Sequence, residues 1–366
     1  MFENQYEVMI GDCLDTLKTI QTGSVNCIVT SPPYFGLRQY SDEKGEIGIE
    51  ETPEEYAENL VKVFDECWRV LHDTGTLWLN LGDTYAASGG GRQTADRRAA
   101  SGMLEKNTDK SFKRIPTGGR KPKDLIGIPW LVAFALQKAG WYLRKDIIWN
   151  KPAVMPEPVK DRPVSSHEHI FLLAKSKRYF YDREAIKEPT QYKRDVWNII
   201  PRPWGGAHFA IYPSELAETC ILAGTSAHGR CSRCFAQYER ITEKTMPKNA
   251  EQLHAVGGME TRHPNPRRGQ QRVTENGTVP SYIPIKHKTV GWKPTCDCGA
   301  DHEPSVVLDP FGGSGTTAGA SIKFGRKAIL CELNPEYATV IPDRIAHIMG
   351  VKNPDQTTGF DEWFAN

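Results

Sequence analysis

The chain has 366 residues, which is long enough to bury a large core and to form two lobes. Its 46 Lys and Arg residues balance 45 Asp and Glu residues, and the net charge of +1 excludes a surface that is basic throughout. Any nucleic-acid contact must therefore come from local clusters of charge. The chain has no apolar run of membrane-spanning length and no secretory leader, so we expect a cytoplasmic protein.

The first eighty or so residues alternate between strand and helix patterns. Runs rich in β-branched residues predict strands, and apolar residues on one face predict helices. Strands are expected at 6–12, 25–30 and 76–81, and helices at 13–20 and 53–72, the second of which is ended by Gly75. This alternation indicates a parallel sheet covered by helices, the α/β class.

The alternation breaks at residues 86–123, which hold ten Lys or Arg and three Asp or Glu residues. A loop of this charge is plausible as a phosphate-contacting segment, with a plain solvated insertion as the alternative. Residues 225–304 are a second insertion, polar and rich in Pro, Arg and Gly. Helices are expected at 129–139, 213–223, 316–324 and 335–349, strands at 142–149, 169–174, 195–199, 305–308 and 327–331, and a hairpin partner for 169–174 at 178–181.

The strand at 25–30 ends in Thr30-Ser31-Pro32-Pro33-Tyr34. Adjacent prolines cannot extend a sheet, because they lack N–H donors and fix φ, and they leave rigid carbonyl groups. Rigid acceptors beside a hydroxyl and an aromatic ring suit a planar base that carries an amino group. The alternative is a strand-ending turn with a buried Tyr.

A second motif, Asp309-Pro310-Phe311-Gly312-Gly313-Ser314-Gly315-Thr316-Thr317, follows the strand at 305–308. The glycines allow positive φ and close approach of a ligand, and the helix start offers free N–H groups. No Lys follows the last Gly, so the run does not fit a phosphate-binding P-loop. Glu332 ends the next strand, at a position that serves ribose hydroxyls in nucleoside-binding sheets. Together these features predict a cofactor site at the carboxyl ends of the strands.

The two motifs resemble those of the S-adenosylmethionine-dependent DNA amino-methyltransferases, the cytosine-N4 and adenine-N6 family. Thr30-Ser31-Pro32-Pro33-Tyr34 resembles their catalytic motif, and the run from Asp309 resembles their cofactor motif. The catalytic motif comes first, as in the permuted group called β. The resemblance covers about 1–85, 125–224 and 305–350. It implies a Rossmann-like methyltransferase fold, circularly permuted, with a mostly parallel seven-stranded sheet in which one strand is antiparallel.

The resemblance also implies which residues form the site. The expected catalytic residues are Ser31, Pro32, Pro33 and Tyr34, and the residues expected around S-adenosylmethionine are Asp12, Asp309, Pro310, Phe311, Gly312, Gly313, Gly315, Thr316, Thr317 and Glu332. Asp12 would lie near the adenine and Glu332 would hold the ribose. Trp149 ends a strand in a neighbourhood that the family often uses at the target-base pocket, and a core Trp is the alternative.

The residue before Pro-Pro-Tyr bears on which atom receives the methyl group. An acidic residue there is typical of adenine-N6 enzymes, whereas Ser31 resembles cytosine-N4 enzymes, so we expect cytosine-N4 with adenine-N6 as the alternative. Carbon-5 methylation would need a Cys nucleophile after a Pro, and the chain has no Pro-Cys dipeptide. The target base would have to be flipped out of the duplex. The remaining alternatives are a methyltransferase that acts on RNA or on a protein glutamine side chain, and a catalytically silent DNA- or cofactor-binding regulator.

Four of the nine cysteines form two close pairs, Cys231 with Cys234 and Cys296 with Cys298. Four thiolates from two turns match a structural zinc site, and disulfides are not expected in a cytosolic protein. We therefore expect a small zinc-ribbon-like insertion, with His302 as an alternative ligand and four free thiols as the competing interpretation.

The expected partner is double-stranded DNA, in a bacterial or phage-infected cell, with a partner restriction endonuclease as a further expectation. The insertion between the cysteine pairs is a candidate for DNA recognition because it carries Arg262, Arg267, Arg268 and Arg272. Segment 153–207 competes for that role. The expected divisions are a catalytic half at 1–85, a basic loop at 86–124, the rest of the catalytic half at 125–224, the insertion at 225–304, a cofactor-binding half at 305–350 and a tail at 351–366.

Overall fold

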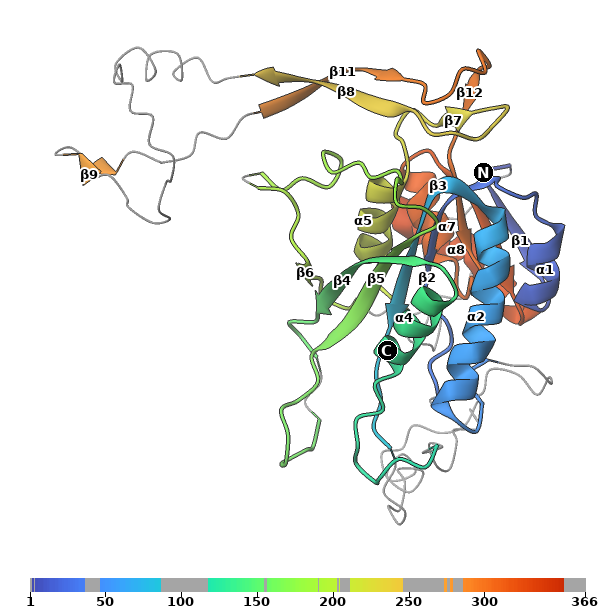
Figure 1. Cartoon of the computed structure of the whole chain (residues 1–366), viewed down its shortest axis with the longest axis vertical. Coiled ribbons are helices and arrows are strands. Elements are labelled where there is room, and N and C mark those ends of the chain that lie inside the picture. The colour runs from blue at the N-terminus through green and yellow to red at the C-terminus, as the bar shows by residue number, and fades with distance from the viewer. Residues whose placement is uncertain are drawn as a thin grey trace, which may run out of the picture.

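An eight-stranded sheet forms the centre of the protein, with helices on both of its faces (Figure 1). The computed structural model describes residues 2, 4–36, 47–86, 118–154, 157–189, 191–202, 204, 211–245, 273–274, 277–278 and 286–351. The strands, in their order across the sheet, are β1 (Tyr6–Ile10), β14 (Lys327–Glu332), β13 (Val306–Asp309), β2 (Val25–Thr30), β3 (Leu71–Leu81), β5 (His167–Ala174), β4 (Tyr142–Asn150) and β6 (Val196–Asn198).

The predicted mostly parallel sheet is confirmed, but the implied number of seven strands is wrong. The short strand β6 adds an eighth by pairing in parallel with β4. Strand β5 is antiparallel to both of its neighbours, β3 and β4, and the other adjacent pairs are parallel. The predicted hairpin strand at 178–181 does not form, because both edges of β5 are already paired.

The strand directions define two edges of the sheet. We call the side where β1, β14, β13, β2, β3 and β4 end the carboxyl edge, and the opposite side the amino edge. Because β5 runs the other way, its first residues lie at the carboxyl edge, where His169 pairs with Leu81 and Glu168 pairs with Trp149. Polar residues at the start of β5 therefore join those at the ends of the parallel strands.

Three helices cover one face of the sheet: α1 (Cys13–Thr19), α2 (Pro53–Val70) and α4 (Ile128–Lys138). Thr52 and Glu55 form a capping box at the start of α2, and the predicted apolar stripe of this helix is buried. The prediction that Gly75 ends the helix is wrong. The helix ends at Val70, and Leu71 already begins β3, so Gly75 lies inside a strand.

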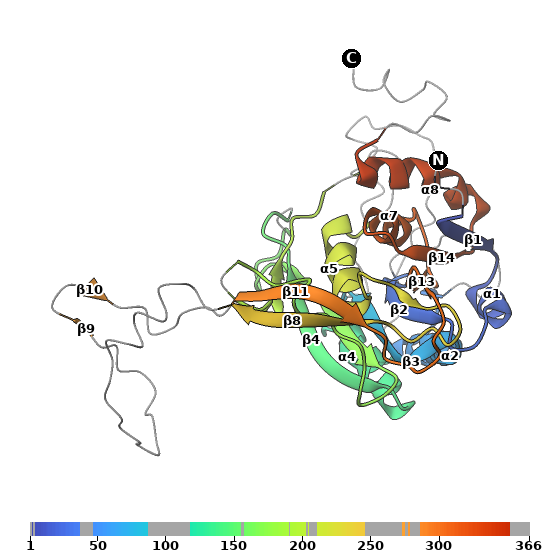
Figure 2. The same ribbon diagram turned by 90° about the horizontal axis from the view of Figure 1, so that it is seen from above.

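The other face is covered by α5 (Ser214–Gly224), α7 (Thr316–Lys323) and α8 (Pro335–Met349), which lie side by side in Figure 2. Small residues let α7 pack closely, since a side chain added at Gly319 would meet Ile348 at 2.6 Å. The positions of all these helices agree with the predicted ranges to within two residues at either end. The apolar pattern of the chain therefore predicts where these helices begin and end.

The insertion at 225–304 begins at the amino edge and carries a two-stranded ribbon away from the sheet (Figures 1 and 2). The strands within it are β7 (Arg230–Cys231), β8 (Glu239–Thr245), β9 (Val273–Thr274), β10 (Gly277–Thr278), β11 (Lys286–Lys293) and β12 (His302–Glu303). Strand β7 pairs with β12, and β8 pairs with β11 to form the ribbon. Arg262, Arg267, Arg268 and Arg272 lie outside the described residues.

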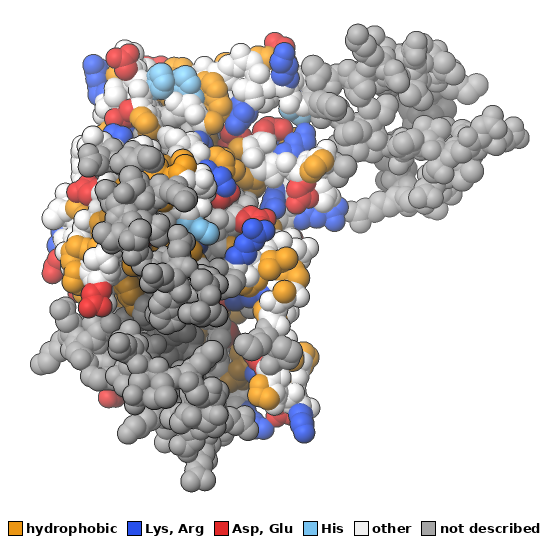
Figure 3. All heavy atoms as spheres, turned by 180° about the vertical axis from the view of Figure 1, so that it is seen from behind, with side chains coloured by type: hydrophobic (Ala, Val, Ile, Leu, Met, Phe, Trp, Pro, Cys, Tyr) orange, Lys and Arg blue, Asp and Glu red, His pale blue; other side chains and the backbone are white. Residues whose placement is uncertain are grey.

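Charged side chains of both signs are interspersed on the face shown in Figure 3, as the balanced composition of the chain leads us to expect. Of the predicted basic loop at 86–124, residues 87–117 lie outside the described residues. Among the helices of the described ranges, none has the length and apolar character needed to cross a membrane.

Candidate active site and cysteine cluster

The two motifs meet at the carboxyl edge, although they lie 279 residues apart in the chain. Strands β2 and β13 are parallel neighbours, so their last residues lie side by side. The hydroxyl of Thr30 donates a hydrogen bond of 2.6 Å to Asp309 Oδ1. The first residue of one motif is thus bonded to the first residue of the other.

Asp309 is the centre of a buried hydrogen-bond network and is only 1% exposed. Besides Thr30, its carboxylate accepts hydrogen bonds from the hydroxyl of Thr317 at 2.6 Å, the hydroxyl of Tyr212 at 3.1 Å and the backbone N–H of Phe311 at 3.1 Å. Burial raises the pKa of Asp309 to about 6, although the hydrogen bonds from Thr30 and Thr317 oppose the shift. The network ties β2, β13 and α7 together; direct contact of Asp309 with a cofactor stays a prediction.

The raised pKa of Asp309 predicts how the stability of the protein depends on pH. The folded state binds the Asp309 proton more tightly than the unfolded chain does, so protonation favours folding as the pH falls from about 6 to 3.8. Relative to an Asp309→Asn variant, which cannot titrate, the wild type should gain up to about 3 kcal/mol across this window. Urea unfolding of both proteins at several pH values measures the difference between their free energies of unfolding. The contributions of the other carboxylates cancel in that difference. A difference in unfolding free energy that does not change with pH would contradict the prediction.

The glycines of the second motif are required by its geometry. Gly315 has φ of 86° and precedes α7, and an added Cβ would lie 2.8 Å from the side chain of Ile341. Gly312 donates its N–H to the carbonyl of Cys331 at 2.8 Å, and a Cβ there would approach Leu330 Cβ to 2.9 Å. The loop therefore lies closely against the end of β14.

Glu332 ends β14, the strand beside this loop, and Asp12 lies two residues after the end of β1, at the start of α1. The Glu332 carboxylate accepts N–H hydrogen bonds from Gly313 at 2.7 Å and Asn334 at 2.9 Å, and burial raises its pKa although these bonds lower it. Asp12 caps α1 by accepting the N–H of Leu14 at 2.8 Å. The remaining residues predicted around the cofactor, Pro310, Phe311 and Thr316, follow β13. The structure therefore brings the predicted cofactor residues together along β1, β14 and β13; their contacts with a cofactor stay predictions.

The Pro-Pro turn of the first motif is held from two sides. The hydroxyl of Tyr56, from α2, donates to the carbonyl of Pro33 at 2.9 Å. Ser31 Oγ lies 3.3 Å from Tyr34 Oη, and the ring of Tyr34 lies against Gly82, where an added Cβ would come within 2.7 Å of a ring carbon. The Ser31 hydroxyl and the Tyr34 ring are thus held side by side at the end of β2.

Sequence reasoning missed a carboxylate beside this turn. Glu168, at the start of β5, accepts hydrogen bonds from Tyr34 Oη at 2.7 Å and Asn80 Nδ2 at 3.0 Å, and it forms an ion pair with Lys151. In the sequence Glu168 is simply a polar residue before an apolar run. Its position beside Tyr34 follows only from the antiparallel direction of β5, which puts the start of this strand at the carboxyl edge. Trp149 takes its alternative role in the core: it is 3% exposed, and its indole N–H donates to the carbonyl of Ile199.

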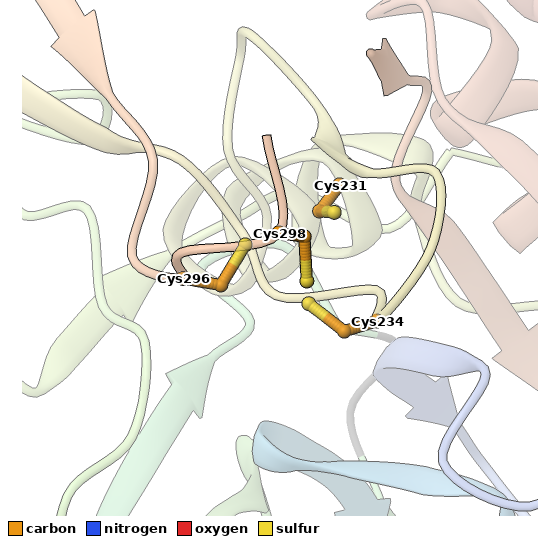
Figure 4. Close-up of side chains that lie close together, drawn as sticks. All are labelled: Cys231, Cys234, Cys296 and Cys298. Atoms are coloured by element: carbon orange, nitrogen blue, oxygen red, sulfur yellow. The ribbon is translucent and has the colours of Figure 1, made fainter. Parts of the chain in front are cut away.

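The four paired cysteines converge, as Figure 4 shows, with all four sulfur atoms within 4.8 Å of one another. A tetrahedral Zn²⁺ with Zn–S bonds of about 2.3 Å separates its sulfur ligands by about 3.8 Å, so this spacing suits the ion. The N–H of Arg233 also points to Cys231 Sγ at 3.5 Å, as in a turn that wraps a metal. His302 is not part of this group and instead stacks on His228 at 4.2 Å.

This cysteine cluster is joined to the amino edge of the sheet, opposite the two motifs. Asn26, near the start of β2 and fully buried, donates its amide to the carbonyl of Phe235 at 2.9 Å. Its amide oxygen accepts the N–H of Val306 at 3.0 Å and a guanidinium N–H of Arg230 at 3.3 Å. Arg230 also donates to the carbonyl of Ser24. The cluster thus packs on the strands whose far ends carry the motifs.

Comparison with known proteins agrees with this arrangement. The sequence model of the N6/N4 family, described as DNA methylase, matches residues 25–231 and 300–343. The chain is 37% identical over 348 residues to the type II methyltransferase M.SmaI of Serratia marcescens, covering 93% of this chain and 90% of that protein. It is 49% identical over 220 residues to M.Cfr9I of Citrobacter freundii, covering 59% of this chain and 71% of that protein.

Two solved structures are similar to the fold. The PvuII DNA methyltransferase, described as cytosine-N4-specific, has a TM-score of 0.55 at 16% identity, with 95% of this chain and 94% of that chain covered. A putative DNA modification methylase from Thermus thermophilus, in complex with S-adenosyl-L-methionine, has a TM-score of 0.50 at 20% identity, with 94% and 96% covered. At these identities the similarity establishes the fold alone.

Proposed function

The chain belongs to the N6/N4 DNA methylase family, and on that premise we propose that it is a type II, site-specific DNA methyltransferase that uses S-adenosylmethionine. The observation that carries the proposal is the hydrogen bond between Thr30 and Asp309. It joins the proposed catalytic motif, which begins at Thr30, to the proposed cofactor motif, which begins at Asp309. The permuted order of these motifs along the chain is part of the same proposal.

The cofactor residues proposed from the sequence fit a nucleoside ligand. Glu332 ends β14 and accepts the N–H of Gly313 from the glycine loop. Asp12 follows the neighbouring strand β1, and the N–H of Gly11 beside it donates to the carbonyl of Glu332 at 2.9 Å. Carboxylates at this edge suit ribose hydroxyls and the adenine amino group. When bound, S-adenosylmethionine supplies an electrophilic methyl group on its sulfonium sulfur.

The first motif holds the acceptor amino group. The nitrogen lone pair of a nucleobase amine is delocalised into the ring, so the amine is a poor nucleophile. The Ser31 hydroxyl and the Pro32 carbonyl accept its two N–H bonds and turn the lone pair out of the ring, while Tyr34 stacks on the base. Ser31 is too weak a base to deprotonate the amine beforehand, so the proton leaves to water after transfer has begun.

Within this family, we propose cytosine-N4 rather than adenine-N6 as the target. The support is Ser31 itself, which places a neutral hydroxyl where adenine-N6 enzymes typically have an acidic residue. The target amino group lies inside a duplex, so the base must be flipped out to reach Ser31.

We also propose that Cys231, Cys234, Cys296 and Cys298 hold a structural Zn²⁺. Cys231 is 1% exposed and the other three are partly buried, so the four sulfur atoms form a closed site without an open ligand position. Such an ion would hold the two ends of the insertion together beside Asn26.

Segment 153–207 is favoured over the insertion for reading the bases. Residues 151–166 link the end of β4 to the start of β5, and both of these points lie at the carboxyl edge. The cysteine cluster lies at the amino edge, where it is bonded to the start of β2. A duplex with a base flipped toward Ser31 therefore lies on the same edge of the sheet as the loop after β4.

Incubation of the protein with duplex DNA and tritiated S-adenosylmethionine tests the proposed function. We expect label in DNA, and digestion to nucleosides should give N4-methylcytosine. Label in N6-methyladenine would overturn the cytosine assignment alone, and an absence of label in every DNA would overturn the function. Sequencing of modified bases in cells that express the chain identifies the site, and restriction of unmodified DNA by a neighbouring gene product tests for a partner endonuclease.

A further inference from the structure

We propose that Glu168 is a positioning residue for methyl transfer that acts through the hydroxyl of Tyr34. The inference rests on the proposed function, because it assumes that the target base stacks on Tyr34. Glu168 reaches the motif only because β5 is antiparallel and starts at the carboxyl edge. From there it accepts the Tyr34 hydroxyl hydrogen bond at 2.7 Å.

The carboxylate of Glu168 is itself fixed by two donors, one in β3 and one just after β4. Asn80, near the end of β3, donates its amide to Glu168 Oε2 at 3.0 Å, and Lys151, just after β4, pairs with Oε1. The side chains of Glu168 and Lys151 are only 15% and 19% exposed, so solvent screens this pair less than a surface pair. Lys151 is in turn held over the ring of Trp149, with Nζ 4.4 Å from the centroid.

These contacts hold the Tyr34 ring along one edge and at its hydroxyl. Gly82 lies against the ring, and Glu168 anchors the hydroxyl. Burial and the nearby Glu168 raise the pKa of Tyr34 well above its usual value, so the phenol keeps the proton that it donates. A ring that is already oriented loses little conformational freedom when a base stacks on it, and this favours the geometry for in-line transfer.

The test uses a duplex that carries the site identified by sequencing and compares three variants. Tyr34→Phe removes only the hydroxyl and leaves Glu168 bonded to Lys151 and Asn80, whereas Glu168→Ala removes the acceptor. Each should lower kcat about tenfold, the value of one charge-assisted hydrogen bond, while KM for S-adenosylmethionine stays unchanged. The double variant should fall no further than Tyr34→Phe alone, because the hydroxyl that Glu168 holds is then already absent.

Two further variants separate positioning from general damage to the fold. Glu168→Gln keeps an acceptor oxygen and should recover most of the kcat lost in Glu168→Ala. Glu218→Gln, which breaks the ion pair between α5 and Lys323, should leave kcat at the wild-type value. If Glu168→Ala does not fold, Tyr34→Phe decides the question. An active wild type with unchanged Tyr34→Phe kinetics, or losses that multiply in the double variant, would overturn this inference alone. A wild type that labels no DNA would overturn the proposed function and this inference with it.

Discussion

Replacing Ser31 by Ala is expected to lower kcat for methyl transfer to DNA by about a hundredfold, as the loss of one preorganised hydrogen bond at a reacting group does. In the proposed mechanism this hydroxyl is the acceptor that turns the amino lone pair toward the methyl donor, and Ala offers no substitute for it. Ser31 follows Thr30 in the chain and takes no part in the Thr30–Asp309 hydrogen bond. The contact between the two motifs should therefore be kept in Ser31→Ala. The measurements are single-turnover rates and the affinity for S-adenosylmethionine, which should not change.

The chain offers a matched control for this substitution at the other end of the same strand. Ser24 immediately precedes β2, and its hydroxyl bonds only locally, to the carbonyl of Gln21 at 2.7 Å. Ser24→Ala should keep the wild-type rate, with a stability change within about 0.5 kcal/mol. Full activity in Ser31→Ala would contradict the role proposed for the hydroxyl. Equal losses in both variants would point to damage along β2 rather than to lost chemistry.

The sequence predicted the parts of the fold that depend on local apolar pattern. All six residues of β2 are buried, and four of them, Val25 and Cys27 to Val29, are apolar, as a strand covered on both faces requires. The stripe on α2 likewise predicted which face of this helix packs. Gly75 was taken as the stop signal of the helix predicted at 53–72, but the helix already ends at Val70. In the structure Gly75 lies within β3, where its missing side chain leaves room for Leu71.

The sequence could not supply contacts that depend on strand direction or on distant partners. His167-Glu168-His169 gives no local sign that β5 runs against its neighbours, so Glu168 was missed although it bonds Tyr34. Asp309 was predicted from its motif, but not its four donors, one of which is Thr30. Cysteine spacing predicted that the four thiols converge, whereas their position at the amino edge depends on the buried side chain of Asn26.

Removal of the metal proposed at the cysteine cluster is expected to have the largest effect on stability. The wild type should contain about one zinc per chain by elemental analysis, and Cys231→Ser should contain none, because three thiolates leave the tetrahedral site open. Structural zinc contributes about 10–16 kcal/mol to the folding of small zinc domains, so the insertion should lose its order. Amide exchange should then become fast in β7 and β12, and at Val306, whose N–H is held by Asn26.

The position of the cluster predicts which part of the molecule remains ordered after metal loss. The Thr30–Asp309 hydrogen bond lies at the opposite edge of the sheet and depends on no cysteine, so amides of β3 and β5 should stay protected in Cys231→Ser. Cys13→Ser is the matched control, since Cys13 lies in α1, outside the cluster, and its substitution should leave the zinc content at one per chain. A wild type without zinc, expressed in zinc-supplemented medium, or a Cys231→Ser protein with unchanged exchange in β7 would contradict the proposed site. Uniform loss of protection throughout the sheet would instead mean that the insertion and the catalytic sheet unfold as one cooperative unit.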